Sequence, residues 1–385
     1  MLLNNVAIHT TNIPYYYCKS IEELSKEIIQ EIDCKKYIIV FDESLPRKDI
    51  DLLSSHLGEH SSVKIVGISV SEAAKNIFVF NKLVEVLIEN NITRDTYIIA
   101  IGGGILGNIV GLVSGLLYRG INFIHVPTTF IACADSVLSI KQAVNSSCAK
   151  NIIGTYYAPV AIFTCYSLFK TLPLEHISAG YVEYVKNMMI IVPEIITPFL
   201  SSNLNLSKLS YNQVLTFIDN SINAKNILLK NDPHERNEAI IFEYGHTIGH
   251  AIEIISDGQI NHGEGVAFGM LVSTLISNKL GFMQKEHVDT LVMLLNKIGI
   301  IDFLKQKAYL INQISNNELL KTLSYDNKRG YILTKSNEIA MVILKNYAEV
   351  LMTNDKCLIP VNKDIVIYSY IDAQNILGRV MKINI

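Results

Sequence analysis

The sequence has few charged residues and lacks the excess of one charge that is typical of proteins that bind polyanions. Charged residues make up 18% of the 385 residues, and the formal net charge is −3. A net charge this small gives no general electrostatic attraction to nucleic acid or to acidic membranes. We therefore expect neither of them as a partner. Hydrophobic residues make up 49% of the chain, which is enough for a large core in two or three domains.

The sequence also lacks a C-x-x-C pair and an obvious targeting segment. Because its six cysteines are scattered, neither a zinc knuckle nor a disulfide framework is predicted. Reduced thiols in a cytoplasm are the simplest interpretation. The first twelve residues, MLLNNVAIHTTN, have no basic start and no continuous apolar run. We therefore expect no signal peptide and a cytoplasmic location.

One uncharged stretch, residues 97–117, is long enough to span a bilayer, and Gly111 and Gly115 form a G-x-x-x-G pattern within it. However, the glycines at 102–104 would break a helix near its start. The segment 97–101, YIIAI, is short and β-branched like a buried strand. The stretch therefore predicts a strand, a glycine loop and a helix, with a membrane span as the alternative.

Short apolar segments typical of strands recur in the first part of the chain, and helical patterns lie between the first few. This alternation predicts an open α/β sheet. Strands are expected at 37–41, 63–69, 97–101, 121–126 and 160–165, and helices at 20–32 and 73–91.

The periodicity becomes helical from about residue 170 to about residue 325, with cap signals such as SNNEL and TLPLEH. A β-like tail is expected at 339–352. The sequence therefore predicts an α/β domain over residues 1–168 and a mainly α-helical domain over residues 169–385. A cleft between two such domains is the default place for a ligand.

The glycine loop satisfies G-x-G-x-x-G at Gly102, Gly104 and Gly107. Glycines let the backbone approach a pyrophosphate, and the start of the following helix offers free N–H donors. The pattern is not specific by itself, because glycines also serve tight turns. It also follows the third expected strand, and no acid stands about twenty residues further on. Asp42, after the first expected strand, offers a carboxylate for a ribose hydroxyl; the alternative is an acid in a surface turn.

The segment FEYGHTIGHAIE, residues 242–253, predicts one helix with Glu243, His246 and His250 on one face. Two histidines four residues apart are typical of a metal site. The H-E-x-x-H protease pattern is absent, because Thr247 stands where its glutamate would be. The segment is therefore either half of an active site or a polar network satisfied inside a core.

Further ligand candidates lie elsewhere in the chain. His262 stands in a glycine-containing NHGEG segment, and Glu183 and Lys186 lie one helical turn apart in GYVEYVKNMM. Spacing alone leaves open which of His246, His250 and His262 bind a metal. A hydrogen-bonded core histidine is the alternative for any one of them.

Four blocks of the sequence resemble, in order, those of the dehydroquinate synthase-like sugar phosphate cyclases. The resemblance covers roughly residues 35 to 330 and implies an N-terminal NAD-binding α/β domain, a helical metal-binding C-terminal domain and a homodimer. The blocks are GGGILGNIVGLVSGLLYRGINFIHVPTTFIACADSVLSIKQAVNSSCAKNIIGTYYAP, TLPLEHISAGYVEYVKN, NDPHERNEAIIFEYGHTIGHAIE and HGEGVAFGM.

The resemblance also implies a set of site residues. The ligands of one divalent metal would be Glu183, His246 and His262, a donor set that suits Zn²⁺ or Co²⁺. Asn108 departs from the acid common at the end of the family's GGGxxGD loop, which leaves its role open. The NAD+ site would use Asp42, Glu72, Lys75, Gly103, Gly104, Asn108, Thr128, Thr129, Ser139, Lys150 and Asn151.

Two departures from dehydroquinate synthases bear on the substrate. Those enzymes carry Asn where this chain has Glu243, and Arg where it has Ala239. Such an Arg suits a substrate carboxylate, so its loss fits a substrate without one, such as glucose 6-phosphate. A glutamate near the ring fits hydroxyl binding or proton transfer, because two anions would repel each other. The segments DSVLSIKQAVNSS and EYGHT carry a closer resemblance to members that make the carbocycle of 2-deoxystreptamine antibiotics.

By the same resemblance, Lys141 and Glu243 are the expected catalytic residues. Lys186, His250 and Arg119 would bind the phosphate of a small sugar phosphate, with Arg119 reaching from the partner subunit. The alternatives are a solvated loop lysine for Lys141 and a carboxylate paired with a nearby base for Glu243. The rival activities are dehydroquinate synthase, a sedoheptulose 7-phosphate cyclase, a metal-dependent polyol dehydrogenase and a non-catalytic homologue.

Overall fold

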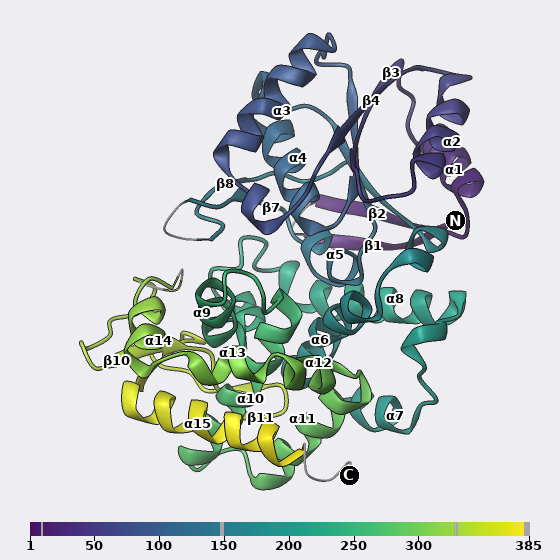
Figure 1. The fold of residues 1–385 in the computed structure, drawn as a ribbon. Helices are drawn as coiled ribbons and strands as arrows, with labels where there is room; N and C mark the ends of the chain where they lie inside the picture. Colours follow the sequence, from purple (N-terminus) through teal and green to yellow (C-terminus); the bar gives the residue numbers. More distant parts are fainter. Residues whose placement is uncertain (9–10, 147–149, 327, 329, 381–385) are drawn as a thin grey trace. The chain divides into compact units, whose positions relative to one another are not determined.

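The computed structural model describes residues 1–8, 11–146, 150–326, 328 and 330–380, which fall into two compact units (Figure 1). The first unit comprises Met1–Pro173 and Leu209–His234, and the second comprises Leu174–Lys208 and Glu235–Ile385. This division differs from the single boundary expected at residue 168, because a later segment of the chain returns to the first unit.

The first unit is built on a seven-stranded sheet with the order β1-β2-β9-β6-β5-β3-β4. β1 pairs antiparallel with β2, and the other neighbours are parallel. The five expected strands are confirmed, but β1 and β2 were missed because asparagines and a proline interrupt their apolar pattern. The strands are β1 (Leu2–Ile8), β2 (Thr11–Cys18), β3 (Lys36–Asp42), β4 (Ser62–Ile68), β5 (Tyr97–Gly102), β6 (Phe123–Pro127) and β9 (Ala161–Cys165).

Helices cover both faces of this sheet, and alternate residues of a strand meet different helices. Tyr37, Ile39 and Phe41 of β3 pack with α1 and α2, whereas Ile38 and Val40 pack with α3 and α4. Figure 1 shows the two helix pairs on opposite sides of β3 and β4. Burial on both faces explains the continuous apolar runs of the strands. The helices are α1 (Ile21–Glu31), α2 (Arg47–Gly58), α3 (Ile77–Glu89) and α4 (Gly104–Leu116).

The returning segment of the first unit is helix α8 (Tyr211–Leu229), which packs against β1. Asn226 donates to the carbonyl of Asn5 at 2.8 Å and accepts from the N–H of Ala7 at 2.8 Å. Lys225 Nζ lies 2.6 Å from Oδ1 of Asp135. These polar contacts hold a helix of the second half of the chain on the edge of the sheet.

The second unit is mainly helical, as predicted, and α10 is its central helix. α10 packs against α6, α9, α11, α12 and α15 and is buried along most of its length. The predicted β-like tail is confirmed in part by β10 (Glu338–Met341), β11 (Leu344–Asn346) and β12 (Glu349–Val350), whereas β13 (Ile359–Asn362) and α15 were not predicted. The helices are α6 (Leu174–Ile190), α7 (Ile196–Ser201), α9 (His246–Ile255), α10 (His262–Lys279), α11 (Lys285–Lys297), α12 (Ile300–Gln306), α13 (Ala308–Gln313), α14 (Asn316–Leu323) and α15 (Lys363–Val380).

The uncharged stretch 97–117 forms strand β5, a turn at Gly103 and helix α4, as predicted. Within the described part of the chain, every helix is too short or too polar to cross a membrane. The five described cysteines are free, in agreement with the expected absence of a disulfide framework. Cys148 lies outside the described residues.

Glycines allow α9 and α10 to pack with their backbones in contact. A Cβ on Gly269 would lie 1.9 Å from the carbonyl oxygen of Gly245, and one on Gly249 would lie 2.9 Å from the carbonyl carbon of Gly265. No side chain larger than hydrogen fits at such distances. The two helices could not approach this closely with any other residue at these positions.

We expect Gly269→Ala to lower the free energy of unfolding by at least about 2 kcal/mol, because the added methyl group pushes α10 away from α9. The matched control is Gly378→Ala in α15, where an added Cβ meets no atom within 4 Å. That change should be neutral or stabilise by about 0.5–1 kcal/mol. Urea denaturation of both variants measures the difference, and equal effects would contradict the close packing.

Candidate active site

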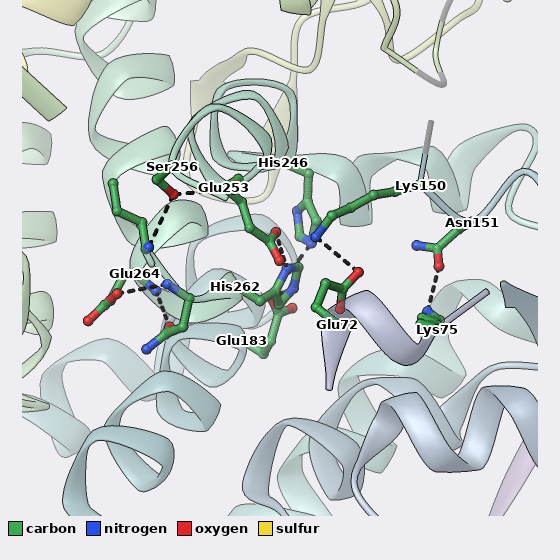
Figure 2. A network of polar contacts seen from close by, with 12 residues as sticks. Glu72, Lys75, Lys150, Asn151, Glu183, His246, Glu253, Ser256, His262 and Glu264 are labelled. Atoms are coloured by element: carbon green, nitrogen blue, oxygen red, sulfur yellow. Dashed lines mark hydrogen bonds and ion pairs between the residues drawn. The ribbon is translucent and has the colours of Figure 1, made fainter. Parts of the chain in front are cut away.

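Three side chains from three helices of the second unit converge on one point. Glu183 comes from α6, whereas His246 and His262 are the first residues of α9 and α10. One possible ligand atom of each lies within 4.8 Å of the other two. Nε2 of each imidazole lies 3.7 Å from Oε1 of Glu183 (Figure 2). The structure thus brings together the three residues to which the resemblance assigned a metal.

The convergence depends on close contact between α6 and the start of α10. A Cβ on Gly263 would lie 2.5 Å from the Cα of Ala179. Ala179 lies one helical turn before Glu183, and Gly263 directly follows His262. The glycine therefore lets the carboxylate and the imidazole face each other at short range.

Glu183 carries a desolvated negative charge. Its side chain is 1% exposed, and Lys186 Nζ lies 2.5 Å from Oε2. Burial by itself raises the pKa of Glu183, but Lys186 and the two imidazoles outweigh burial and hold the pKa well below its usual range. The carboxylate is therefore ionised inside the unit.

These residues fit a divalent metal. Apart from the ion pair of Oε2 with Lys186, neither oxygen of Glu183 has a partner in hydrogen-bond geometry among the described residues, so Oε1 can be satisfied by a metal cation. Two imidazole nitrogens and one carboxylate oxygen form a three-ligand set that leaves a coordination position open. The same donors suit Zn²⁺ and Co²⁺.

The two histidines of this cluster differ in charge. Burial lowers the pKa of His246 to about 4, and Lys186 adds to this effect. His246 is therefore neutral near pH 7, which is the form that binds a metal. For His262 burial also lowers the pKa, but the carboxylates of Glu183 and Glu253 outweigh it and raise the pKa to about 10. In the metal-free chain His262 therefore carries a positive charge between two carboxylates.

His250 lies close to the cluster but is not part of it. Its ring centroid is 5.2 Å from that of His246 and 5.8 Å from that of His262. The three-residue group that could hold a metal does not include it. His250 is half-buried, and burial lowers its pKa well below the usual range. A neutral imidazole beside the cluster remains available to a substrate.

The prediction of one helix across residues 242–253 is wrong. The 3-10 helix η7 (Glu238–Glu243) ends before Tyr244, and α9 begins at His246. Gly245 separates the two with φ of 82°, a left-handed conformation that glycine adopts without strain. Glu243 therefore precedes the break and does not continue the histidine face of α9.

Glu243 is paired with a buried lysine that sequence analysis missed. Lys328 Nζ lies 3.1 Å from Oε2 of Glu243 and 2.9 Å from Oδ1 of Asp326, and its side chain is 2% exposed. Burial lowers the pKa of Lys328, but the two carboxylates outweigh this and raise it. The pairing matches the alternative given for Glu243, a carboxylate beside a base. The signal in the sequence was the polar segment SYDNKRG after α14.

Asn187 was also missed. It lies one turn beyond Glu183 on α6 and is 1% exposed. Neither polar atom of its side chain has a hydrogen-bond partner among the described residues. Because an unsatisfied buried amide is costly, Asn187 is a candidate to bind a ligand or water molecule near the cluster.

A polar network fixes the first turn of α10, which carries His262. Asn261 caps the helix: its side chain accepts from the N–H of Glu264 at 3.0 Å, and Glu264 accepts from the N–H of Asn261 at 2.8 Å. Lys307 Nζ lies 2.8 Å from Glu175 and 2.9 Å from Glu264. Because Glu264 is fully buried, the network holds the start of α10 firmly in place.

In the first unit, the glycine loop and the two threonines lie together at the carboxyl ends of β5 and β6. The N–H of Thr128 donates to the carbonyl of Gly102 at 3.0 Å. A Cβ on Gly103 would lie 3.2 Å from Cγ2 of Thr129, and one on Gly104 would lie 2.8 Å from Oγ of Ser136. Asp42 ends the neighbouring strand β3. Gly103 is the N-cap of α4, so the free N–H groups in the first turn of that helix face this corner.

A second polar group in the first unit joins two loops (Figure 2). Lys150 Nζ lies 3.2 Å from Oε1 of Glu72, and Lys75 donates to Asn151 at 2.5 Å. Asn145, which sequence analysis missed, donates to Glu72 at 2.8 Å and accepts from the N–H of Asn151 at 2.8 Å. Four of the residues expected at the NAD+ site thus lie in one network.

The remaining predicted residues of the first unit are spread more widely. Ser139 accepts from the N–H of Lys141, the first residue of β7 (Lys141–Val144), which pairs with β8 (Ile153–Tyr156). Asn108 is half-buried in the first turns of α4. Arg119 is exposed beyond the far end of α4, about 20 Å along that helix from the glycine loop. Within one chain, α4 therefore separates Arg119 from the loop.

Comparison with known proteins agrees with this architecture. Family models described as 3-dehydroquinate synthase N-terminal and C-terminal match residues 65–179 and 180–329. The 2-deoxy-scyllo-inosose synthase of Niallia circulans is 37% identical over 332 residues, which cover 86% of this chain and 88% of the relative.

Solved structures extend the comparison. A 2-deoxy-scyllo-inosose synthase complexed with carbaglucose-6-phosphate, NAD+ and Co²⁺ has a TM-score of 0.85 and 32% identity, covering 95% of this chain and 98% of the other. ValA, the 2-epi-5-epi-valiolone synthase from Streptomyces hygroscopicus subsp. jinggangensis 5008 with NAD+ and Zn²⁺ bound, has a TM-score of 0.79 at 17% identity, with coverages of 96% and 98%. At that identity the likeness shows a common fold.

We expect the purified chain to bind one Co²⁺ or Zn²⁺, and His262→Asn to weaken binding by at least about 100-fold, because one of three ligands is lost. His262 is 29% exposed, so this change should spare the core. The matched control is His250→Asn, which should bind the metal as the unchanged chain does. Isothermal titration calorimetry of metal-stripped protein measures both. Loss of binding in the control alone would contradict the assignment.

Proposed function

The chain belongs to the dehydroquinate synthase-like sugar phosphate cyclases, and we propose that it converts D-glucose 6-phosphate to 2-deoxy-scyllo-inosose and phosphate. The proposed reaction is the carbocycle-forming step of aminoglycoside biosynthesis, in which NAD+ and one divalent metal are the cofactors. The observation that carries the proposal is the buried cluster of Glu183, His246 and His262 in a chain whose relatives with this activity match most of its length.

The surroundings of Glu243 support a neutral ring rather than a carboxylate as the substrate. The position of the family's arginine is held by Ala239, which is fully buried in η7 and offers no cation. Glu243 and Asp326 already neutralise the nearby Lys328. An added substrate carboxylate would therefore meet two anions, and Ala239 offers no guanidinium group to bind it.

The proposed reaction balances without an external oxidant. C4 is oxidised to a ketone, which acidifies the proton on C5, and loss of that proton expels phosphate from C6. Re-reduction of C4 restores the NAD+. The ring then opens, and C6 attacks the aldehyde at C1 to close the carbocycle. The product differs from the substrate by phosphoric acid alone, so the nicotinamide shows no net change.

Different residues of the chain would contribute to different steps of this reaction. When bound, the metal would supply Lewis acidity at the C4 hydroxyl, and NAD+ would supply a reversible hydride acceptor. Glu183, His246 and His262 would hold the cation, and Lys186 and His250 would bind the substrate phosphate. Glu243, paired with Lys328, would accept or donate a proton during ring opening. Lys141 would serve as the second acid or base and bind phosphate.

We propose that NAD+ is bound by the first unit. The glycine loop, Thr128 and Thr129 offer N–H and hydroxyl donors to its pyrophosphate, and Asp42 offers a carboxylate to a ribose hydroxyl. Ser139 and the network of Glu72, Lys75, Lys150 and Asn151 form the rest of the proposed NAD+ site, and the amide of Asn108 is assigned to the nicotinamide side.

We further propose that the enzyme is a cytoplasmic homodimer. The proposal rests on the family resemblance and on Arg119, which is exposed and lies about 20 Å from the glycine loop of its own chain. By the family resemblance, Arg119 would bind phosphate in the partner subunit's active site. Sedimentation equilibrium measures the oligomeric state.

With NAD+ and Co²⁺, we expect the purified enzyme to release phosphate from glucose 6-phosphate with no net change in the nicotinamide absorbance band. Glu243→Gln should lower kcat by about 10²–10⁴-fold while metal binding is retained. The matched control is Glu349→Gln, an exposed carboxylate of the same unit, which should leave kcat unchanged.

Three outcomes would contradict the substrate assignment. Turnover of the heptulosonate phosphate alone would identify a dehydroquinate synthase, and turnover of sedoheptulose 7-phosphate alone would identify the valiolone-type reaction. Net formation of NADH with a polyol would identify a dehydrogenase.

A further inference from the structure

Glu253 is a buried carboxylate to which the proposed mechanism assigns no role. It lies on α9 two turns beyond His246, and its side chain is 7% exposed. Oε2 of Glu253 lies 3.6 Å from Nδ1 of His262. Figure 2 shows the carboxylate beside this ring. A charged group is kept out of water here, and it faces the side of an imidazole that points away from the metal cluster.

The ring of His262 thus lies between two carboxylates. Its Nε2 is 3.7 Å from Glu183, and its Nδ1 is 3.6 Å from Glu253. An imidazole binds a metal through one nitrogen, and a hydrogen bond from the other nitrogen fixes the tautomer and the orientation of the ring. The geometry makes Nε2 the ligand atom and directs the Nδ1–H toward Glu253.

His246 shows the same arrangement with a different acceptor. Its Nε2 faces Glu183, and its Nδ1–H donates to the carbonyl of Tyr244 at 3.2 Å. His246 is 8% exposed, whereas His262 is 29% exposed. Burial and a backbone carbonyl orient the ring of His246, whereas the ring of His262 is more exposed.

We propose that Glu253 is a positioning residue of the metal site, which holds His262 through Nδ1 so that Nε2 meets the cation. This inference rests on the proposed function, because it requires Glu183, His246 and His262 to bind a metal. A charged acceptor makes a stronger hydrogen bond than a carbonyl does, which suits the more exposed ring. It also raises the basicity of the ligand nitrogen.

Glu253 is itself well anchored. It lies on α9, and α9 contacts α10 through Gly249 and Gly265 with no side chain between them. Ser256 donates to the backbone carbonyl of Glu253 at 3.2 Å at the end of the helix. The distance between Glu253 on one helix and His262 on the other is therefore set by rigid backbone contacts.

The test compares Glu253→Gln and Glu253→Ala with the unchanged enzyme, in the absence of substrate. The measurements are the dissociation constant for Co²⁺, by competition with a chelator, and the visible absorption spectrum of the bound cobalt. Glu253→Ala should weaken Co²⁺ binding by about 10–100-fold. Glu253→Gln should weaken it less, because the amide keeps an acceptor oxygen on the Nδ1 side of His262. Both spectra should keep the band pattern of an unchanged ligand set.

A matched control separates this effect from a general loss of charge. Glu338→Gln makes the same change at a carboxylate of the same unit that contacts Lys335, and it should leave Co²⁺ binding unchanged. Melting temperatures of the metal-free proteins report on the fold. Glu253→Gln keeps the size of the side chain, so it keeps the test valid if the alanine variant fails to fold.

The outcomes distinguish the inference from the proposed function. If the unchanged chain binds no Co²⁺, the proposed function fails together with the inference. If it binds Co²⁺ and both Glu253 variants bind equally tightly, the inference alone is overturned. A change of the cobalt spectrum to that of a lower coordination number would make Glu253 a ligand and would also overturn the positioning role.

Discussion

The active centre of the second unit depends on one buried charge, the carboxylate of Glu183. An ionised carboxylate removed from water is costly unless cations and hydrogen bonds surround it. Lys186 supplies one cation at 2.5 Å, and the two imidazoles face the other oxygen at 3.7 Å. A divalent cation held by the same three residues would complete the compensation. The negative charge that makes burial of Glu183 unfavourable is thus the same charge that suits this side chain to bind a metal.

The charged side chain of Glu183 can be surrounded in this way only if helices α6, α9 and α10 pack unusually close together. Gly263 lets α10 meet Ala179 of α6, and Gly249 and Gly269 let α10 meet α9. The capping network around Glu264 then fixes the start of α10, so His262 does not move away. The distances between the three candidate ligands are therefore set by close backbone contacts between helices. Any residue larger than glycine would prevent these contacts.

The two units contribute different kinds of binding groups. The first places glycines and threonines where parallel strands end, with free N–H groups at the start of α4. The second unit packs acidic and basic side chains together, such as Lys328 with Glu243 and Asp326. Loops at strand ends suit a nucleotide's pyrophosphate, whereas buried acids and bases suit a metal and proton transfer. A cyclase that uses both cofactors needs both kinds of site.

The sequence by itself determined the local features. Its apolar runs gave the central strands, and its glycines gave the loop before α4, because both depend on neighbouring residues. Motif blocks named Glu183, His246 and His262, although spacing alone left His250 equally eligible. Only the tertiary structure broke the helix at Gly245, returned α8 to the first unit and paired Glu243 with Lys328, 85 residues away. Those outcomes depend on contacts between segments far apart in the chain, which no local pattern encodes.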